Sequence, residues 1–179
     1  MRILIPLADG FEEIEAVTTI DVLRRAGLDV TTMGLAGTMV RGSRGVSVIA
    51  DKKISDVNDI EKEFDALVLV GGSPGYANLG KSNRILDVIR RFDEKKKTIA
   101  AICAAPSLLQ KAGILQNRKA TIYPGMEREI ARPREGRVVV DDNIITSQGP
   151  GTAMEFAFKI VETLLGPESV IQLKEEMVC

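Results

Sequence analysis

The stretch DALVLVGG, residues 65–72, gives the clearest indication of the fold. Its apolar run, residues 66–70, is continuous and stops at Gly71 and Gly72. A continuous run, without polar residues at every second position, is typical of a strand that is buried on both faces of a sheet. The stretch therefore predicts a central strand of a parallel sheet, followed by a glycine-rich loop.

Similar short runs lie on both sides of this strand and alternate with segments of helical apolar spacing. Strands are predicted at 2–7, 28–35, 98–103, 119–123, 137–141 and 143–147, and a hairpin or edge excursion at 40–54. Helices are predicted within 9–27, 82–97, 104–113, 151–166 and 167–179. Thr152 and Glu155 have the spacing of a capping box at the start of the last long helix. This alternation predicts one α/β domain over residues 1–179, with a mainly parallel sheet and right-handed crossovers.

The composition excludes several classes of protein. Lys and Arg number 24 and Asp and Glu number 25, so no basic surplus indicates a nucleic-acid partner. No apolar run reaches 18 residues, and the run at the N-terminus is too short for a signal peptide, so we expect a cytoplasmic protein without a membrane span. Two cysteines make no disulfide framework, and the absence of histidine excludes Ser-His and Cys-His catalytic pairs. We expect neither a metal nor another cofactor.

Three predicted strand ends carry unusual residues: PLADGFEE (6–13), VGGSPG (70–75) and AICAAP (101–106). Ligands of open α/β sheets bind at the carboxyl ends of the strands. Small residues around Cys103 suit a sharp strand-to-helix turn that presents a nucleophile. Pro106 would then fall in the first turn of the next helix, whose N-terminus would favour the thiolate. The alternative is that Cys103 is a small buried hydrophobic residue.

The other two strand ends also have two interpretations. The glycine-rich loop at 70–75 either presents backbone N–H groups to an anion or is a tight turn. It is not a Walker A loop. Glu12, Glu13 and Glu15 open the first helix, where acidic residues normally complement the helix dipole and lie in solvent. Helical spacing does not decide which of the three faces the sheet.

Together these residues resemble the DJ-1/ThiJ/PfpI superfamily, most closely its DJ-1 branch, which includes proteins of the deglycase and glyoxalase III type. The resemblance rests on ADGFEEIEAVTTIDVLRRAG (8–27), GLAG (34–37), VLVGGSPGYANL (68–79), AAICAAP (100–106) and TSQGPGTAMEFA (146–157), in the family's order. It implies a flavodoxin-like three-layer sandwich similar to class I glutamine amidotransferases. It also implies that Cys103 is the reactive residue, that Glu15 hydrogen-bonds its sulfur, and that the backbone N–H groups of Gly72 and Ala104 form an oxyanion hole.

The chain departs from the family pattern at two places. PfpI-type peptidases have a histidine directly after the cysteine, where this chain has Ala104. Many DJ-1-like members have a histidine before a later proline, where this chain has Tyr123 before Pro124. A peptidase is therefore not expected. Gly71, Tyr123 and Pro124 are candidates for the lining of the pocket.

The resemblance also implies a homodimer, whose first helices pack near the active site. Arg25 and Arg44 are the arginines expected near the pocket in that assembly. Two functions follow from the family. One is a cofactor-independent glyoxalase or deglycase for small dicarbonyls such as methylglyoxal. The other is an oxidative-stress sensor or chaperone-like protein that works through oxidation of Cys103.

Overall fold

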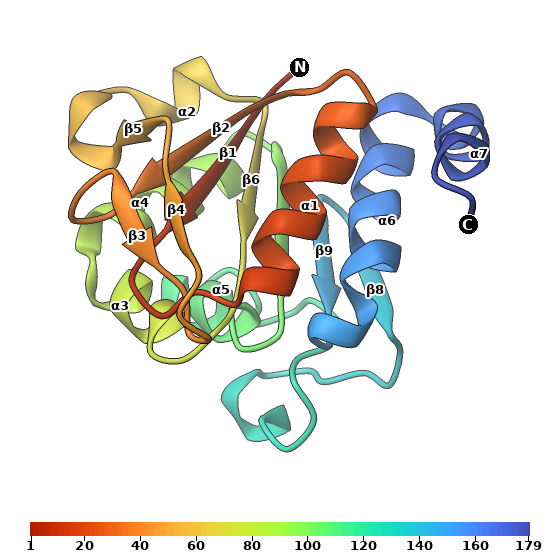
Figure 1. Cartoon of the computed structure of the whole chain (residues 1–179). Helices are drawn as coiled ribbons and strands as arrows, with labels where there is room; N and C mark the ends of the chain where they lie inside the picture. The colour runs from red at the N-terminus through yellow and green to blue at the C-terminus, as the bar shows by residue number, and fades with distance from the viewer.

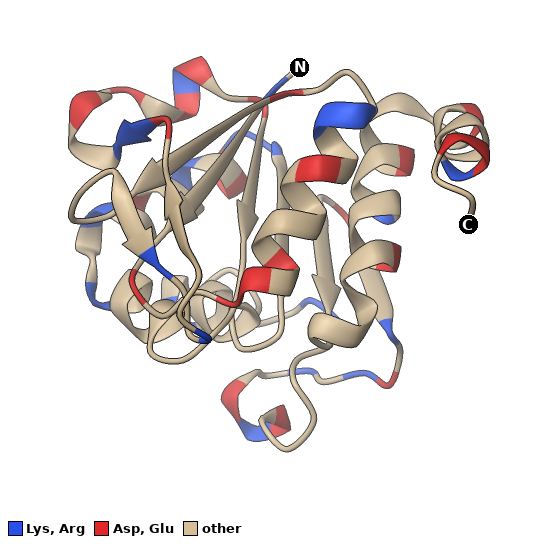
Figure 2. Cartoon of the chain, in the orientation of Figure 1, with Lys and Arg blue, Asp and Glu red and all other residues tan.

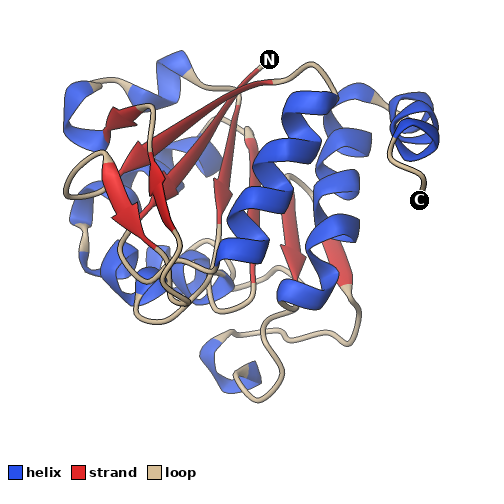
Figure 3. Cartoon of the chain, in the orientation of Figure 1, coloured by secondary structure: helices blue, strands red, loops and turns tan.

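The computed structural model describes residues 1–179 and has a seven-stranded sheet between two layers of helices (Figures 1 and 3). The strand order is β5-β2-β1-β6-β7-β9-β8, and only β8 runs antiparallel to its neighbour. The strands are β1 (Arg2–Leu7), β2 (Asp29–Gly34), β5 (Lys52–Lys53), β6 (Ala66–Leu69), β7 (Thr98–Ile102), β8 (Val138–Asp141) and β9 (Ile144–Ser147). The order of β2, β1, β6, β7 and β9 is that of flavodoxin-like sheets. The predicted three-layer fold with a mainly parallel sheet is confirmed.

The helices divide between the two faces of this sheet. α1, α6 and α7 contribute to one core, with α1 and α6 side by side, and α2 to α5 contribute to the other (Figure 1). The helices are α1 (Glu13–Arg25), α2 (Ile60–Glu63), α3 (Gly75–Lys81), α4 (Asn83–Glu94), α5 (Pro106–Ala112), α6 (Ala153–Leu165) and α7 (Pro167–Glu176). Short 3-10 turns lie at Ile54–Asp56, Glu127–Glu129 and Pro150–Thr152. None of the helices has both the length and the apolar character needed to span a bilayer.

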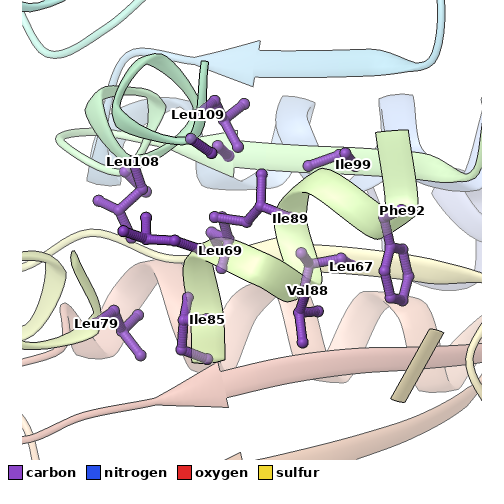
Figure 4. Packing of buried hydrophobic residues seen from close by; sticks show 14 of the residues in the cluster. Leu67, Leu69, Leu79, Ile85, Val88, Ile89, Phe92, Ile99, Leu108 and Leu109 are labelled. Carbon is purple, nitrogen blue, oxygen red and sulfur yellow. The ribbon is translucent and has the colours of Figure 1, made fainter. Parts of the chain in front are cut away.

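β6 confirms the interpretation of residues 65–72, because all four of its side chains are buried. Leu67 and Leu69 belong to the core under α4 and α5, where they join Ile85 and Ile89 (Figure 4). Ala66 and Val68 belong to the core on the opposite face. Alternate residues of a strand point to opposite faces, so a strand between two helical layers must be apolar at every position. Each buried leucine contributes roughly 2 kcal/mol.

The segment 40–54 contains the predicted hairpin. β3 (Met39–Arg41) and β4 (Ser47–Ile49) form a separate antiparallel pair. Two backbone hydrogen bonds tie the hairpin to the loop after β1: Gly10 N–H donates to the Arg41 carbonyl at 2.7 Å, and Ser43 N–H donates to the Phe11 carbonyl at 2.8 Å. The turn of the hairpin therefore lies beside the start of α1.

Three sequence-based predictions about local structure are wrong or incomplete. Residues 119–123 form no strand: Ala120 makes only an isolated bridge with Pro133, through backbone hydrogen bonds with Arg132 and Arg134. The capping box is also absent: the Thr152 hydroxyl donates to the Gly149 carbonyl at 2.9 Å, and Glu155 pairs with Arg137 at 2.9 Å. α3 was not predicted, because its sequence, GYANLGK, has two glycines and little helical periodicity.

Candidate active site

The three unusual strand ends meet at one edge of the sheet. β6 lies between β1 and β7, and all three are parallel. Their carboxyl ends therefore bring the loop before α1, the glycine-rich loop and the turn at Cys103 together. The strand order also reverses around β1. Flavodoxin-like sheets bind ligands at the carboxyl ends of the strands next to this point.

Cys103 occupies a strained turn between β7 and α5. Its φ is +64°, a left-handed conformation that costs a non-glycine residue about 1–2 kcal/mol. Backbone hydrogen bonds on both sides hold it there: Cys103 N–H donates to the Ser147 carbonyl at 3.0 Å, and Tyr123 N–H donates to the Cys103 carbonyl at 2.9 Å. Ala104 and Ala105 are buried, and Pro106 is the first residue of α5. The elbow predicted from AICAAP is therefore present, and it leaves the thiol half-buried.

The glycine-rich loop must approach Cys103 too closely for any side chain. A methyl group on Gly71 would lie 2.7 Å from Cys103 Cβ and 3.0 Å from its sulfur. Gly72 has a φ of +89°, and a methyl group there would lie 2.2 Å from the backbone nitrogen of Glu12. Close backbone contact explains both glycines, and it places the Gly72 N–H near the sulfur.

Glu15 is the acidic residue that reaches Cys103. Its side chain is completely buried, and its Oε2 accepts a hydrogen bond of 2.7 Å from the Gly71 N–H. The carboxyl lies beside the thiol, since a methyl group on Gly71 would lie 3.0 Å from both the Cys103 sulfur and Glu15 Oε2, and Oε1 has no hydrogen-bond partner. One carboxyl oxygen is thus fixed to the backbone, while the other is free to exchange a proton.

The titration of the pair follows from burial. Desolvation raises the pKa of Glu15 to about 7, against the opposing hydrogen bond from Gly71. Desolvation also raises the pKa of the Cys103 thiol, and the negative charge of Glu15 raises it further, whereas the N–H groups of Gly72 and Ala104 lower it. The N–H of Ala104, just before α5, thus acts in the expected direction, but desolvation and the charge of Glu15 outweigh it and the pKa of the thiol is raised. The thiolate is favoured only when Glu15 is protonated, because protonation removes the repulsion and supplies a hydrogen-bond donor.

Glu12 and Glu13 are buried as well, each about 8% exposed, which contradicts the expectation that most of these acids lie in solvent. Oε1 of Glu13 accepts hydrogen bonds from the Arg44 N–H at 2.7 Å and the Val46 N–H at 3.2 Å. Burial alone would raise the pKa of Glu13, but hydrogen bonds from the backbone and from Ser43 outweigh it and lower the pKa. The acids are buried because the hairpin turn covers the start of α1.

A pocket of about 330 Å³ opens above the thiol. Its lining residues are Glu12, Arg44, Gly72, Ser73, Tyr76, Cys103, Ala104, Tyr123, Met126 and Pro150. Arg44 and Tyr123, two of the candidates, line the pocket within a single chain, and Gly71 and Glu15 lie close to the sulfur. Pro124 and Arg25 do not line it: Pro124 is exposed, and Arg25 lies at the distal end of α1, paired with Asp21.

Several lining residues were not identified from the sequence. Ser73 lies within the glycine-rich loop, Tyr76 directly follows it, and Pro150 lies within TSQGPGTAMEFA, so their position in or beside recognised motifs was an available signal. Met126 follows Tyr123 in a long irregular segment, and no local pattern marks it.

The site thus defines an α/β protein with a cysteine on a strained strand-to-helix turn, beside a buried carboxyl. Comparison with known proteins identifies the group more closely: residues 1–163 match the model of the DJ-1/PfpI family, and the chain belongs to this family.

Individual relatives agree over nearly the whole chain. Protein dj-1beta of Drosophila melanogaster is 42% identical over 172 residues, which cover 93% of this chain and 91% of that protein. The "glutathione-independent glyoxalase DJR-1.2" of Caenorhabditis elegans is 38% identical, with 96% and 91% covered. The solved structure of oxidized Toxoplasma gondii DJ-1 superposes with a TM-score of 0.93 at 40% identity and covers 99% of this chain and 97% of that one.

Proposed function

We propose that the chain is a cofactor-independent, glutathione-independent glyoxalase for small 2-oxoaldehydes such as methylglyoxal, or a deglycase for their adducts. The observation that carries the proposal is the buried Glu15 carboxyl against the Cys103 thiol, with one carboxyl oxygen free of other partners. The name of the C. elegans relative supports this reaction class.

In the first step the Cys103 sulfur bonds to the aldehyde carbon, and the thiol proton passes to the carbonyl oxygen through Glu15. The product is a hemithioacetal. The N–H groups of Gly72 and Ala104, which face the sulfur, would stabilise the oxygen as negative charge develops on it. A Glu15 pKa of about 7 suits this work, because the group both accepts and donates protons near neutral pH.

In the second step Glu15 removes the proton from the former aldehyde carbon, giving an enediol, and a proton is returned to the neighbouring carbon. This leaves a thioester of the 2-hydroxy acid. Water then cleaves the carbon–sulfur bond, releasing lactate from methylglyoxal and restoring the thiol. One carbon is oxidised and its neighbour is reduced, so no external oxidant or reductant is required.

The test is the formation of lactate from methylglyoxal without glutathione, followed in D₂O by NMR. We expect Cys103→Ser to form no lactate, whereas the matched variant Cys179→Ser should behave as wild type. Lactate formation that persists in Cys103→Ser would refute the proposal. We expect no hydrolysis of casein or fluorogenic peptides from about pH 5 to 9, the range around ordinary histidine and cysteine titration, because no imidazole is present to protonate a leaving amine.

The second candidate function is an oxidation sensor or chaperone-like protein working through Cys103. It is favoured by the half-buried thiol in an open pocket and by the relative crystallised as oxidized T. gondii DJ-1. After mild peroxide treatment, mass spectrometry should find added oxygen on the Cys103 peptide before the Cys179 peptide. Earlier oxidation at Cys179 would contradict this function.

We also propose a homodimer. Ile14 and Val17 are 55% and 49% exposed on α1, and Met39 and Ile49 are more than 70% exposed on the neighbouring hairpin. Large apolar side chains exposed on both elements support a contact between copies of the chain. Light scattering at micromolar concentration should give twice the mass of the chain, and a monomer would refute the proposal.

A further inference from the structure

The turn of the hairpin β3–β4, residues 42–46, carries a cation to the mouth of the Cys103 pocket. Arg44 lines this pocket, and its guanidinium makes no ion pair or hydrogen bond within the chain. Arg24 and Arg25, by contrast, are each paired with an aspartate. An unpaired guanidinium beside a reactive group is suited to binding a carboxylate or phosphate through two parallel hydrogen bonds.

The position of Arg44 depends on Glu13. Oε1 of Glu13 accepts hydrogen bonds from the backbone N–H groups of Arg44 and Val46, and Oε2 accepts one from the Ser43 hydroxyl at 3.2 Å. A methyl group on Gly42 would lie only 2.3 Å from Oε1, so the carboxylate fits closely against the turn. Glu13 therefore fixes the backbone from which the Arg44 side chain extends.

We propose that Glu13 is a positioning residue that holds Arg44 as a receptor for a negatively charged substituent on the carbonyl substrate. The proposal rests on the proposed function of the Cys103 site. It narrows the substrate class to 2-oxoaldehydes that carry a carboxylate or phosphate, of which 4,5-dioxopentanoate is a simple member. With this compound the glyoxalase steps would give 2-hydroxyglutarate.

Two acidic residues act against anion binding. Glu12 lines the same pocket and accepts a hydrogen bond from Ser43 at 3.2 Å, and Glu15 lies behind the sulfur. Neither carboxyl forms an ion pair with Arg44. The affinity of the pocket for anions therefore depends on both Arg44 and the nearby carboxyl groups. Glu12→Gln should increase this affinity, and Arg44→Ala should decrease it.

The test compares alkylation of Cys103 by iodoacetate and by iodoacetamide, which are similar in size and differ in charge. The thiolate attacks the CH₂ carbon of either reagent and displaces iodide, so the ratio of the two rates cancels any change in the thiolate fraction. Mass spectrometry resolves the Cys103 peptide from the exposed Cys179, which serves as an internal reference. We expect Arg44→Ala to lower the iodoacetate/iodoacetamide ratio by about two- to five-fold, the range for one exposed charge pair.

Substitutions at Glu13 distinguish its role in positioning Arg44 from the effect of its own negative charge. Glu13→Ala should lower the ratio about as much as Arg44→Ala, and Glu13→Gln should preserve it, because an amide oxygen can accept both backbone hydrogen bonds. In the double variant with Arg44→Ala, Glu13→Ala should cause no further fall. Should Glu13→Ala fail to fold, Glu13→Asp, which is one methylene shorter, is expected to give a partial fall.

Three results would overturn the proposal: an unchanged ratio in Arg44→Ala, a fall in Glu13→Ala that persists without Arg44, or a Glu13→Gln ratio as low as that of Glu13→Ala. Turnover gives a separate readout. Arg44→Ala should raise KM for 4,5-dioxopentanoate relative to its methyl ester. If neither compound turns over while the alkylation ratios follow the prediction, the glyoxalase is refuted and the anion receptor is supported.

Discussion

The two ends of α1 carry opposite charges in opposite environments (Figure 2). At its start Glu12, Glu13 and Glu15 are buried against the sheet edge and the hairpin turn. At its end Arg25 is half exposed and pairs with Asp21 at 2.7 Å. Both arrangements suit the helix dipole, which favours acids at the first turn and bases at the last.

The difference shows that burial, and not the sign of the charge, separates the side chains with fixed backbone partners from the solvated ones on this helix. The carboxylates at the start accept hydrogen bonds from backbone groups of other segments, which fix their geometry. The exposed pair at the end is solvated, and such pairs contribute about 0–1 kcal/mol. Four experiments test this contrast.

The largest effect is expected from Glu15→Gln. Glutamine keeps the hydrogen bond to Gly71 but cannot accept and return a proton, so lactate formation should fall by about 10²–10⁴-fold. Loss of the negative charge should at the same time lower the pKa of Cys103 and speed its alkylation by iodoacetamide at pH 7. Turnover and thiol reactivity thus move in opposite directions. Unaltered turnover would show that Glu15 is not the acid–base residue.

The pH dependence of the free energy of unfolding should reveal the burial of Glu15. The pKa of Glu15 rises from 4.5 to about 7 on folding, so the folded protein binds the proton more tightly than the unfolded chain does. The stabilisation is fully present below about pH 4.5 and is lost as the pH rises through about 7, a change of about 3 kcal/mol. Urea unfolding should show Glu15→Gln gaining this amount over wild type between these pH values. A parallel dependence in both proteins would contradict the raised pKa.

Gly71→Ala tests the closeness of the glycine loop. The added methyl group would lie 2.7 Å from Cys103 Cβ, and both the elbow and Glu15 are fixed, so we expect a loss of about 1–3 kcal/mol. Gly37→Ala is the matched control, because a methyl group there meets nothing within 4 Å. Equal urea midpoints for the two variants would show that the loop accommodates the methyl group without loss of stability.

The smallest effect is expected at the other end of the helix. Arg25→Ala removes a half-exposed ion pair and should change the free energy of unfolding by less than about 0.5 kcal/mol. Alkylation of Cys103 in the isolated chain should not change, since Arg25 lies outside the pocket. A clear change that appears only at concentrations where the protein dimerises would support the predicted approach of Arg25 to the site across a dimer interface.

Much of the fold and part of the site could be predicted because the responsible signals are local. The run at 66–70 is apolar at every position because both faces of β6 are covered, and the alanines after Cys103 are small because the turn is tight. The strand predicted at 119–123 and the Thr152–Glu155 capping box failed for a different reason. In both cases residues outside the local pattern take the groups that it requires: Ala120 bonds to Arg132 and Arg134, and Glu155 pairs with Arg137.

The alternation of strands and helices and the elbow at Cys103 could be predicted from local patterns, and family motifs indicated Glu15. The burial of three neighbouring acids, the presence of Arg44 but not Arg25 in the pocket, and the raised pKa of the thiol could be seen only once the chain was folded. The physical reason is that secondary structure and turns depend on nearby residues, whereas burial and charge environment depend on what other segments bring against a residue. At the start of α1 those segments are the hairpin turn and the glycine loop.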